Sequence, residues 1–179
     1  MTTRNMHLVS SKVTLSPIEE KDKANMLKMA QSELIAKTYM LPIFSNEEQK
    51  EAFFLRLKSL SIDPSRFVYG IHRNEDKALV GFLNEVEKIN EEIEVGYFVD
   101  EDNWGRGYAT DALSLAIEEL FHLGYKKVKA AHFEGNEASA KVMRKAGMKK
   151  SEEDSDVEYR GKIYHCIGYE IINPAILTK

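Results

Sequence analysis

Apolar and polar residues alternate in some stretches of the chain and recur every three or four residues in others, a pattern typical of a mixed α/β protein. The two periods predict the element order β, α, α, β, β, β, α, β, α, β, β. Strands are expected at 12–17, 66–72, 78–88, 92–99 and 127–133, with two more β segments after Met148 around a turn at 159–162. Helices are expected at 20–31, 109–121 and 137–146, and another follows a capping box of Ser45 and Glu48 and ends at Asp63 and Pro64.

The three strand-like segments between 66 and 99 are separated by the turn-like sequences RNEDK and INEE, which predict an antiparallel meander. No internal repeat, low-complexity segment or linker rich in proline, glycine or serine divides the chain. The expected fold is a single α/β domain with a mixed, largely antiparallel sheet flanked by helices. We expect this domain at 12–172, with short terminal extensions at 1–11 and 173–179.

The composition argues against several classes of protein. The 179 residues, 43% of them hydrophobic, suffice for one core. A formal net charge of -4 argues against a basic face that coats nucleic acid. No stretch approaches the roughly 20 apolar residues that span a bilayer. Because Cys166 is the single cysteine, no internal disulfide and no CxxC metal site can form. We therefore expect a cytoplasmic protein without membrane or direct nucleic-acid partners.

The histidines show no spacing typical of a metal site, so no metal ligand is assigned. They are His7, His72, His122, His132 and His165. His132 ends a predicted strand near the expected cleft, where a structural role is the first interpretation.

The stretch DNWGRGYATDA at 102–112 places Gly105 and Gly107 between a predicted strand and the start of a predicted helix. Backbone N–H groups at a helix start have no intrahelical partner, and glycines let an anion approach them, so the loop suits a pyrophosphate. Two familiar phosphate motifs do not fit. No lysine follows the last glycine as in a P-loop, and Thr110 replaces the third small residue of a dinucleotide fingerprint. Taken alone, the glycines also fit a tight strand-to-helix turn.

The segment 94–121, followed by NEASAKVMRKAGM at 136–148, resembles the GCN5-related N-acetyltransferase (GNAT) family. Within that family it is most similar to the branch that includes the ribosomal-protein N-terminal acetyltransferases. The resemblance extends from about Lys12 to Tyr169. It implies that the glycine loop holds the pyrophosphate of acetyl-coenzyme A (acetyl-CoA). It also implies that a primary amine attacks the thioester directly, with no covalent acetyl-enzyme.

The resemblance further implies which residues hold acetyl-CoA. The family's loop pattern Q/R-x-x-G-x-G/A falls on Trp104, Gly107 and Ala109, and tryptophan is a common first residue in this branch. Backbone groups near Phe98 and Val99 would meet the pantetheine arm as an added strand. The expected cofactor residues are Phe98, Val99, Trp104, Gly105, Arg106, Gly107, Tyr108, Ala109, Thr110, Asn136 and Ser139. An asparagine before a helix is also a preferred N-cap, and Ser139 also fits a capping or solvent-facing role.

Glu94 is the expected general base, because relatives often carry a carboxylate at this position. Strand alternation places Glu94 with Gly96 and Phe98 on one face. Partial burial and the neighbours Glu91 and Glu92 are expected to raise its pKa toward working pH. The alternative is that Glu94 is a solvated member of an acidic run.

The tyrosine that many relatives use to protonate the departing thiolate would fall on Met143, which cannot donate a proton. Ser139 is the nearest substitute and solvent is the alternative. By resemblance, a protein or peptide N-terminal α-amino group is the first expected acceptor and a small-molecule amine the second. The missing tyrosine favours a rival interpretation, a non-catalytic acyl-CoA sensor. Both a monomer and a homodimer fit the sequence.

Overall fold

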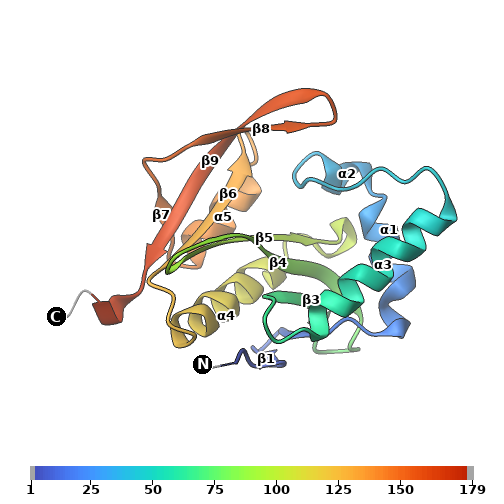
Figure 1. The fold of residues 1–179 in the computed structure, drawn as a ribbon, viewed down its shortest axis with the longest axis horizontal. Helices are drawn as coiled ribbons and strands as arrows, with labels where there is room; N and C mark the ends of the chain where they lie inside the picture. Colours follow the sequence, from blue (N-terminus) through green and yellow to red (C-terminus); the bar gives the residue numbers. More distant parts are fainter. Residues whose placement is uncertain (1–2, 177–179) are drawn as a thin grey trace.

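The computed structural model describes residues 3–176, and within them nine strands form one mixed sheet (Figure 1). The strand order is β1-β2-β3-β4-β5-β6-β9-β7, and β8 pairs with β9. Neighbouring strands are antiparallel except β5 and β6, which are parallel. The strands are β1 (Leu8–Val9), β2 (Val13–Ser16), β3 (Val68–Arg73), β4 (Leu79–Ile89), β5 (Glu92–Val99), β6 (Lys127–Phe133), β7 (Lys149–Lys150), β8 (Ser155–Tyr159) and β9 (Lys162–Ile172).

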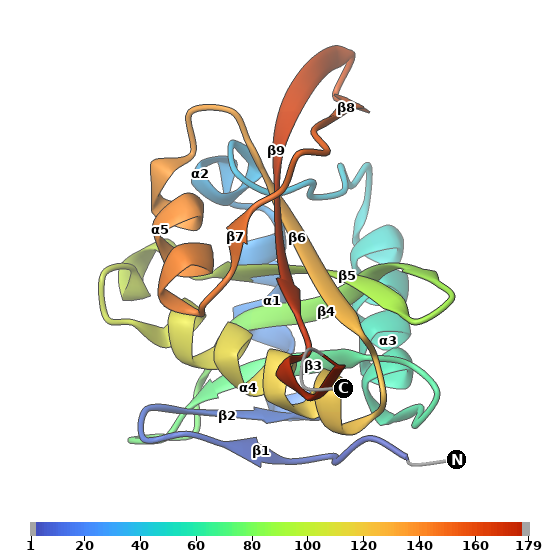
Figure 2. The same cartoon turned by 90° about the vertical axis from the view of Figure 1, so that its left-hand side faces the viewer.

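Helices cover both faces of the sheet, with α3 in front of the strands and α4 and α5 behind them in Figure 1. The helices are α1 (Lys23–Ala30), α2 (Glu33–Ala36), α3 (Glu47–Ile62), α4 (Tyr108–His122) and α5 (Glu137–Lys145). Short 3-10 turns lie at Glu20–Asp22, Glu101–Asn103 and Pro174–Ile176. Figure 2 shows the same arrangement from the side of α5 and β7.

Two separate hydrophobic clusters hold these layers together. One includes Leu113 and Leu120 of α4 and Met143 of α5, packed against β-strand residues such as Val95. The other joins α1, α2 and α3 to the opposite face, where Phe98 is buried. Because successive strand residues point to opposite faces, β5 contributes to both clusters and connects the two cores.

The parallel pairing of β5 with β6 stops early. The register joins Glu92, Ile93 and Glu94 to 127–129, and no later residue of β5 pairs with β6 among the described residues. In Figures 1 and 2, β6 and β9 turn away from β5. The two strands therefore diverge after Glu94, and the divergence opens the sheet beside residues 95–99, where the pantetheine arm was expected to lie as an added strand.

Every predicted element is present and in the predicted order, and the expected ranges for β5 and β6 match the observed strands. The predicted capping box was wrong by one residue. Asn46, rather than Ser45, caps α3 by accepting a hydrogen bond from the Gln49 backbone N–H, while the Ser45 N–H donates to the Gln49 side chain. The sequence did not predict β1, α2 and β7, because segments of two to four residues are too short to show a period. The segment expected to be an N-terminal extension thus adds β1 to the sheet edge.

Candidate active site

The glycine loop has the backbone conformation that only glycine adopts readily. Gly105 and Gly107 have φ angles of 76° and 85°, in the left-handed region, and Gly107 is the N-cap of α4. The first intrahelical hydrogen bond at this end runs from the Asp111 N–H to the Gly107 carbonyl at 3.1 Å. The amides of Tyr108, Ala109 and Thr110 precede that bond and lack intrahelical partners, so the start of α4 presents N–H groups to an anion.

Contacts from other elements fix the loop. Lys28 of α1 lies 3.1 Å from Asp100 and 2.6 Å from Asp102. The Trp104 indole N–H donates to the Val99 carbonyl at 2.7 Å. Lys12, before β2, donates to the Arg106 carbonyl at 3.2 Å and adds a positive charge above the loop. The loop is therefore held at Asp102, Trp104 and Arg106 by contacts from α1, from β5 and from the residue before β2.

A cavity of about 430 Å³ lies between this loop, β5 and α5. We call it the cofactor cleft. Every residue that the sequence assigned to cofactor binding lines it except Arg106, whose side chain is exposed. Lys141 and Lys145, one turn apart on α5, also line it. Sequence reasoning missed these lysines because a charged helix surface is usually only a solvated face.

Backbone direction along β5 decides which groups face the opening. The Lys127 N–H bonds to the Glu91 carbonyl at the start of the parallel pairing, and the Asp100 N–H bonds to Val80 of β4. Peptide groups of a strand alternate between its two neighbours. The backbone groups of Val95, Tyr97 and Val99 therefore face the unpaired side, whereas those of Phe98 face β4. The Val99 N–H thus suits the backbone role expected for it. The backbone of Phe98 is directed toward β4, so Phe98 lines the cleft without offering its backbone groups to a ligand.

The first turn of α5 is held by Asn136 and Ser139. The Asn136 side chain accepts from the Ser139 N–H at 3.2 Å and donates to the Ser139 hydroxyl oxygen at 3.0 Å. Asn136 is therefore an N-cap, and the capping interpretation of this residue is confirmed. The Ser139 hydroxyl accepts this hydrogen bond and keeps its own proton for donation into the cleft.

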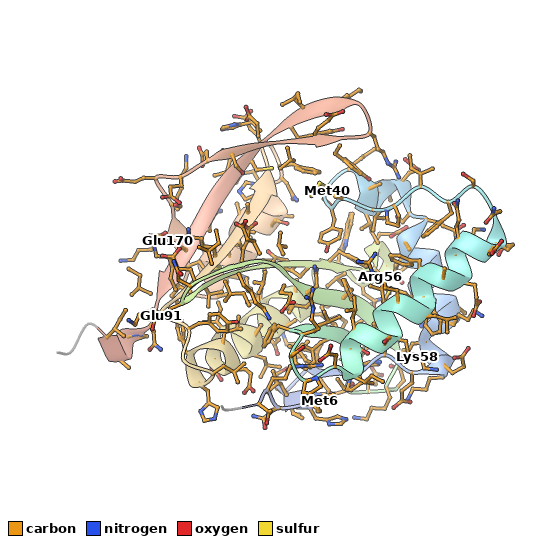
Figure 3. The ribbon with its side chains drawn as sticks, in the orientation of Figure 1. Met6, Met40, Arg56, Lys58, Glu91 and Glu170 are labelled. Atoms are coloured by element: carbon orange, nitrogen blue, oxygen red, sulfur yellow. The ribbon has the colours of Figure 1, made fainter. Side chains whose placement is uncertain are left out.

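A second cavity, of about 550 Å³, opens beside β5 and extends under the β8–β9 hairpin. We call it the acceptor cleft. Its charged lining consists of Glu85, Glu87 and Glu94, and no lysine or arginine of the described residues lines it. Met40, labelled in Figure 3 between β5 and the hairpin, closes one side.

Three residues line both clefts: Thr38, Tyr97 and Ser139. The two cavities meet at these residues, where β5 and β6 have separated. The acceptor cleft reaches residues on both faces of the sheet, since Glu94 shares a face with Phe98, and Tyr97 shares the other with Val95. A molecule in one cleft can thus touch a molecule in the other.

Glu94 is half-buried and no described residue donates a hydrogen bond to its carboxylate. Burial raises the pKa of Glu94, the facing carboxylate of Glu87 raises it further, and Lys129 lowers it. The predicted direction is confirmed, but the predicted neighbours were wrong. Glu91 and Glu92 form ion pairs with lysines of β6 and the turn before it, while Glu87 is the register partner of Glu94 on β4.

His132 and Cys166 also line the acceptor cleft, and both are buried. The His132 Nδ1–H donates to the Phe133 carbonyl at 2.8 Å, so Nε2 carries the lone pair in the neutral ring, and Nε2 has no partner among the described residues. The pKa of the Cys166 thiol is raised by burial and then by Glu94, which disfavours a thiolate. Cys166 is thus a packing residue.

Two further observations concern the described residues as a whole. They contain no group of three or more histidine, cysteine or acidic side chains placed to hold a metal ion. They also contain no helix long and apolar enough to cross a membrane.

Comparison with known proteins decides the family. The sequence pattern of the acetyltransferase (GNAT) domain matches residues 12–149, which include the glycine loop and α5. The chain belongs to the GNAT acetyltransferase family. It is therefore an N-acetyltransferase, and family members use acetyl-CoA as the acetyl donor.

Individual relatives of this GNAT protein extend over nearly its full length. The uncharacterized N-acetyltransferase YoaA of Bacillus subtilis (strain 168) is 23% identical over 171 residues, covering 93% of this chain and 97% of YoaA. A GNAT-family acetyltransferase from Bacillus anthracis superposes with a TM-score of 0.80 at 18% identity, covering 94% of this chain and 99% of the other. A ribosomal-protein-S5-alanine acetyltransferase from Vibrio fischeri gives a TM-score of 0.75 at 19% identity, covering 94% and 97%. These structures share the fold.

Proposed function

We propose that this GNAT enzyme transfers the acetyl group of acetyl-CoA to the α-amino group of a protein or peptide N-terminus. The observation that carries the proposal is the meeting of the cofactor cleft and the acceptor cleft at Thr38, Tyr97 and Ser139. This geometry lets an amine in one cleft reach a thioester in the other, as direct attack requires.

In the cofactor cleft, acetyl-CoA would find matching groups along its length. The free amides at the start of α4 suit the pyrophosphate, and the positive end of the helix favours its charge. Lys12, Lys141 and Lys145 supply further positive charge around the cleft. The Val99 N–H faces the unpaired side of β5 and is available to the pantetheine arm or to the oxyanion that forms on the carbonyl, while the Val99 carbonyl already accepts from the Trp104 indole N–H.

Glu94 is the proposed base, acting directly or through a water. Its raised pKa brings a carboxylate closer to the pKa of an amine that must lose a proton before it attacks. A model α-amino group has a pKa of about 8 and a lysine side chain about 10.4, so an N-terminus is the easier acceptor for this base. The hydroxyl of Ser139, free to donate, is proposed to assist the departure of the thiolate.

The acceptor class rests on two supports. The acceptor cleft is acidic and open beneath the hairpin, which fits a cationic amine attached to a longer chain. The Vibrio fischeri relative is named as a ribosomal-protein acetyltransferase. A small-molecule amine is the second candidate, because Glu87 and Glu94 attract any cation. The buried Glu85, in contrast, is already paired with Arg66 and Lys88.

The test measures thiol release from acetyl-CoA by the purified protein with a panel of acceptors. The panel contains peptides with free N-termini, the same peptides with blocked N-termini, polyamines and aminoglycosides. Turnover with free but not with blocked peptides supports the proposal. Turnover with polyamines or aminoglycosides alone would replace the peptide with a small amine.

Binding of acetyl-CoA without turnover of any acceptor would support the sensor interpretation. A mass-spectrometric comparison of N-terminal acetylation in cells with and without the gene identifies the natural acceptor. A peptide acceptor predicts at least one N-terminus whose acetylation disappears with the gene.

A further inference from the structure

Tyr97 has a hydroxyl group at the point where the two clefts meet, and sequence reasoning assigned it no role. It lies on β5 beside the opening of the sheet and lines both clefts. Its hydroxyl donates to the Ser139 carbonyl at 3.4 Å. This is a long hydrogen bond, so a stronger acceptor nearby can compete for the proton.

The carbonyl that Tyr97 contacts belongs to a particular turn of α5. In an α-helix the carbonyl of residue i accepts from the N–H of residue i+4, so the Ser139 carbonyl lies beside the backbone of Met143. Met143 is the position at which the family resemblance places the tyrosine that serves the leaving thiolate. A phenol from β5 therefore reaches the same turn from the opposite wall of the cleft.

We propose that the Tyr97 hydroxyl donates a hydrogen bond to the sulfur of CoA as it leaves. The inference rests on the proposed acetyl transfer. In that step the amine nitrogen bonds to the acyl carbon, the carbon–sulfur bond breaks, and the electron pair stays on sulfur. Glu94 or a water takes the amine proton, and solvent finally protonates the thiolate. Tyr97 keeps its own proton throughout and lowers the energy of the charged sulfur.

The surroundings suit a donor of this kind. Burial raises the pKa of Tyr97, so the phenol stays protonated throughout the working pH range. A tyrosinate would repel the thiolate, whereas a neutral hydroxyl attracts it. Hydrogen bonds to an ionised acceptor are about twice as strong as neutral ones, most of all where water is excluded.

The experiment compares wild type with Tyr97→Phe, which removes only the hydroxyl. Titration of bound CoA, followed by the ultraviolet absorbance of its thiolate, gives the pKa of the bound thiol without turnover. In the variant, the pKa of the bound CoA thiol should be about one pH unit higher than in wild type. This shift means that the site favours the thiolate over the thiol about tenfold less than the wild-type site does. The kcat of the variant should fall about tenfold or more, with little change in the affinity for acetyl-CoA.

One variant serves as the control, and a second, in which the other hydroxyl proposed to assist the thiolate is removed, serves as a comparison. Tyr125→Phe removes a hydroxyl from the turn between α4 and β6, lines neither cleft, and should change nothing. Ser139→Ala keeps the backbone carbonyl that Tyr97 contacts, so it should shift the thiol pKa less than Tyr97→Phe does.

An unchanged thiol pKa in a folded Tyr97→Phe protein overturns the inference and leaves Tyr97 as a packing residue. If Tyr97→Phe does not fold, the wild type still decides, because the inference requires bound CoA to have a lower thiol pKa than free CoA. A value equal to or above that of free CoA overturns it. Failure of the wild type to bind CoA would instead overturn the proposed function.

Discussion

The cofactor cleft and the acceptor cleft share the wall formed by Tyr97 and Ser139 but are built on different principles. The cofactor cleft offers backbone amides at a helix start, an unpaired strand and lysines around them. The acceptor cleft offers glutamates, aromatic side chains and no lysine or arginine among the described residues. Backbone amides and lysines recognise an anionic donor whatever the surrounding side chains, whereas acidic side chains select a cationic acceptor. The contrast predicts that mutations in the two clefts separate donor binding from catalysis.

The largest expected effect lies on the acceptor side. Glu94→Gln keeps the size of the side chain and removes the proton acceptor, so kcat should fall roughly 10²-fold or more while acetyl-CoA affinity is retained. Because Glu94 acts as a carboxylate, wild-type activity should fall as the pH drops through its raised pKa, and this acidic limb should change in the variant. Steady-state kinetics over pH and calorimetry measure both quantities. Wild-type kcat with the same acidic limb would eliminate Glu94 as the base.

Glu94→Gln is expected to lower activity but not the stability of the fold at neutral pH. A raised folded-state pKa means that protonated Glu94 favours the folded state below its unfolded pKa, and that this contribution is lost as the pH rises through the folded pKa. Glutamine stays neutral, so Glu94→Gln should be at least as stable as wild type at neutral pH. Thermal unfolding at acidic and neutral pH checks this, and a less stable variant at neutral pH would contradict it.

On the cofactor side, Gly107→Val should weaken acetyl-CoA binding at least tenfold, or about 1.4 kcal/mol. A Cβ at Gly107 would meet the Lys12 Nζ at 2.8 Å, and the φ of 85° is strained for valine. Gly124→Val is the matched control, because Gly124 has a φ of 98°, open space around a Cβ and a position outside both clefts. Calorimetry on both folded variants separates loop strain from binding. Normal affinity in folded Gly107→Val would disprove the loop assignment.

Ser139→Ala should lower kcat severalfold and weaken cofactor binding less, because the hydroxyl is proposed to act on the leaving thiolate. The Asn136 cap still accepts from the residue 139 N–H, so the helix start is kept. Parallel measurement of kcat and of the acetyl-CoA dissociation constant tests this. Equal losses in both would reassign Ser139 to binding, and no loss in either would leave it a helix residue.

The smallest effect is expected from the lysines of α5. Lys141→Ala and Lys145→Ala should each weaken acetyl-CoA binding about two- to fivefold at low salt, and less as salt screens the exposed charges. Lys149→Ala and Lys150→Ala, on exposed β7 and outside both clefts, are the matched controls. Equal effects in both pairs would show a general charge effect and no contact with the cofactor.

Local patterns in the sequence determined most of the fold. Alternation gave the limits of β5 and β6, and the spacing of apolar residues gave α4, because both patterns extend over seven residues or more. The glycine loop was recognisable for a similar local reason. Left-handed backbone before a helix favours glycine, and the free amides follow from the helix start itself.

Only the tertiary structure decided how distant residues combine. Glu87 faces Glu94 because a register shift in the β4–β5 pairing brings them together, so the source of the pKa shift could not be read from adjacent residues. Tyr97 reaches Ser139, 42 residues away, only because β5 and β6 part after Glu94. Local periodicity carries no information on where two strands separate, since that depends on the packing of α4 and α5 against one face and α1 to α3 against the other.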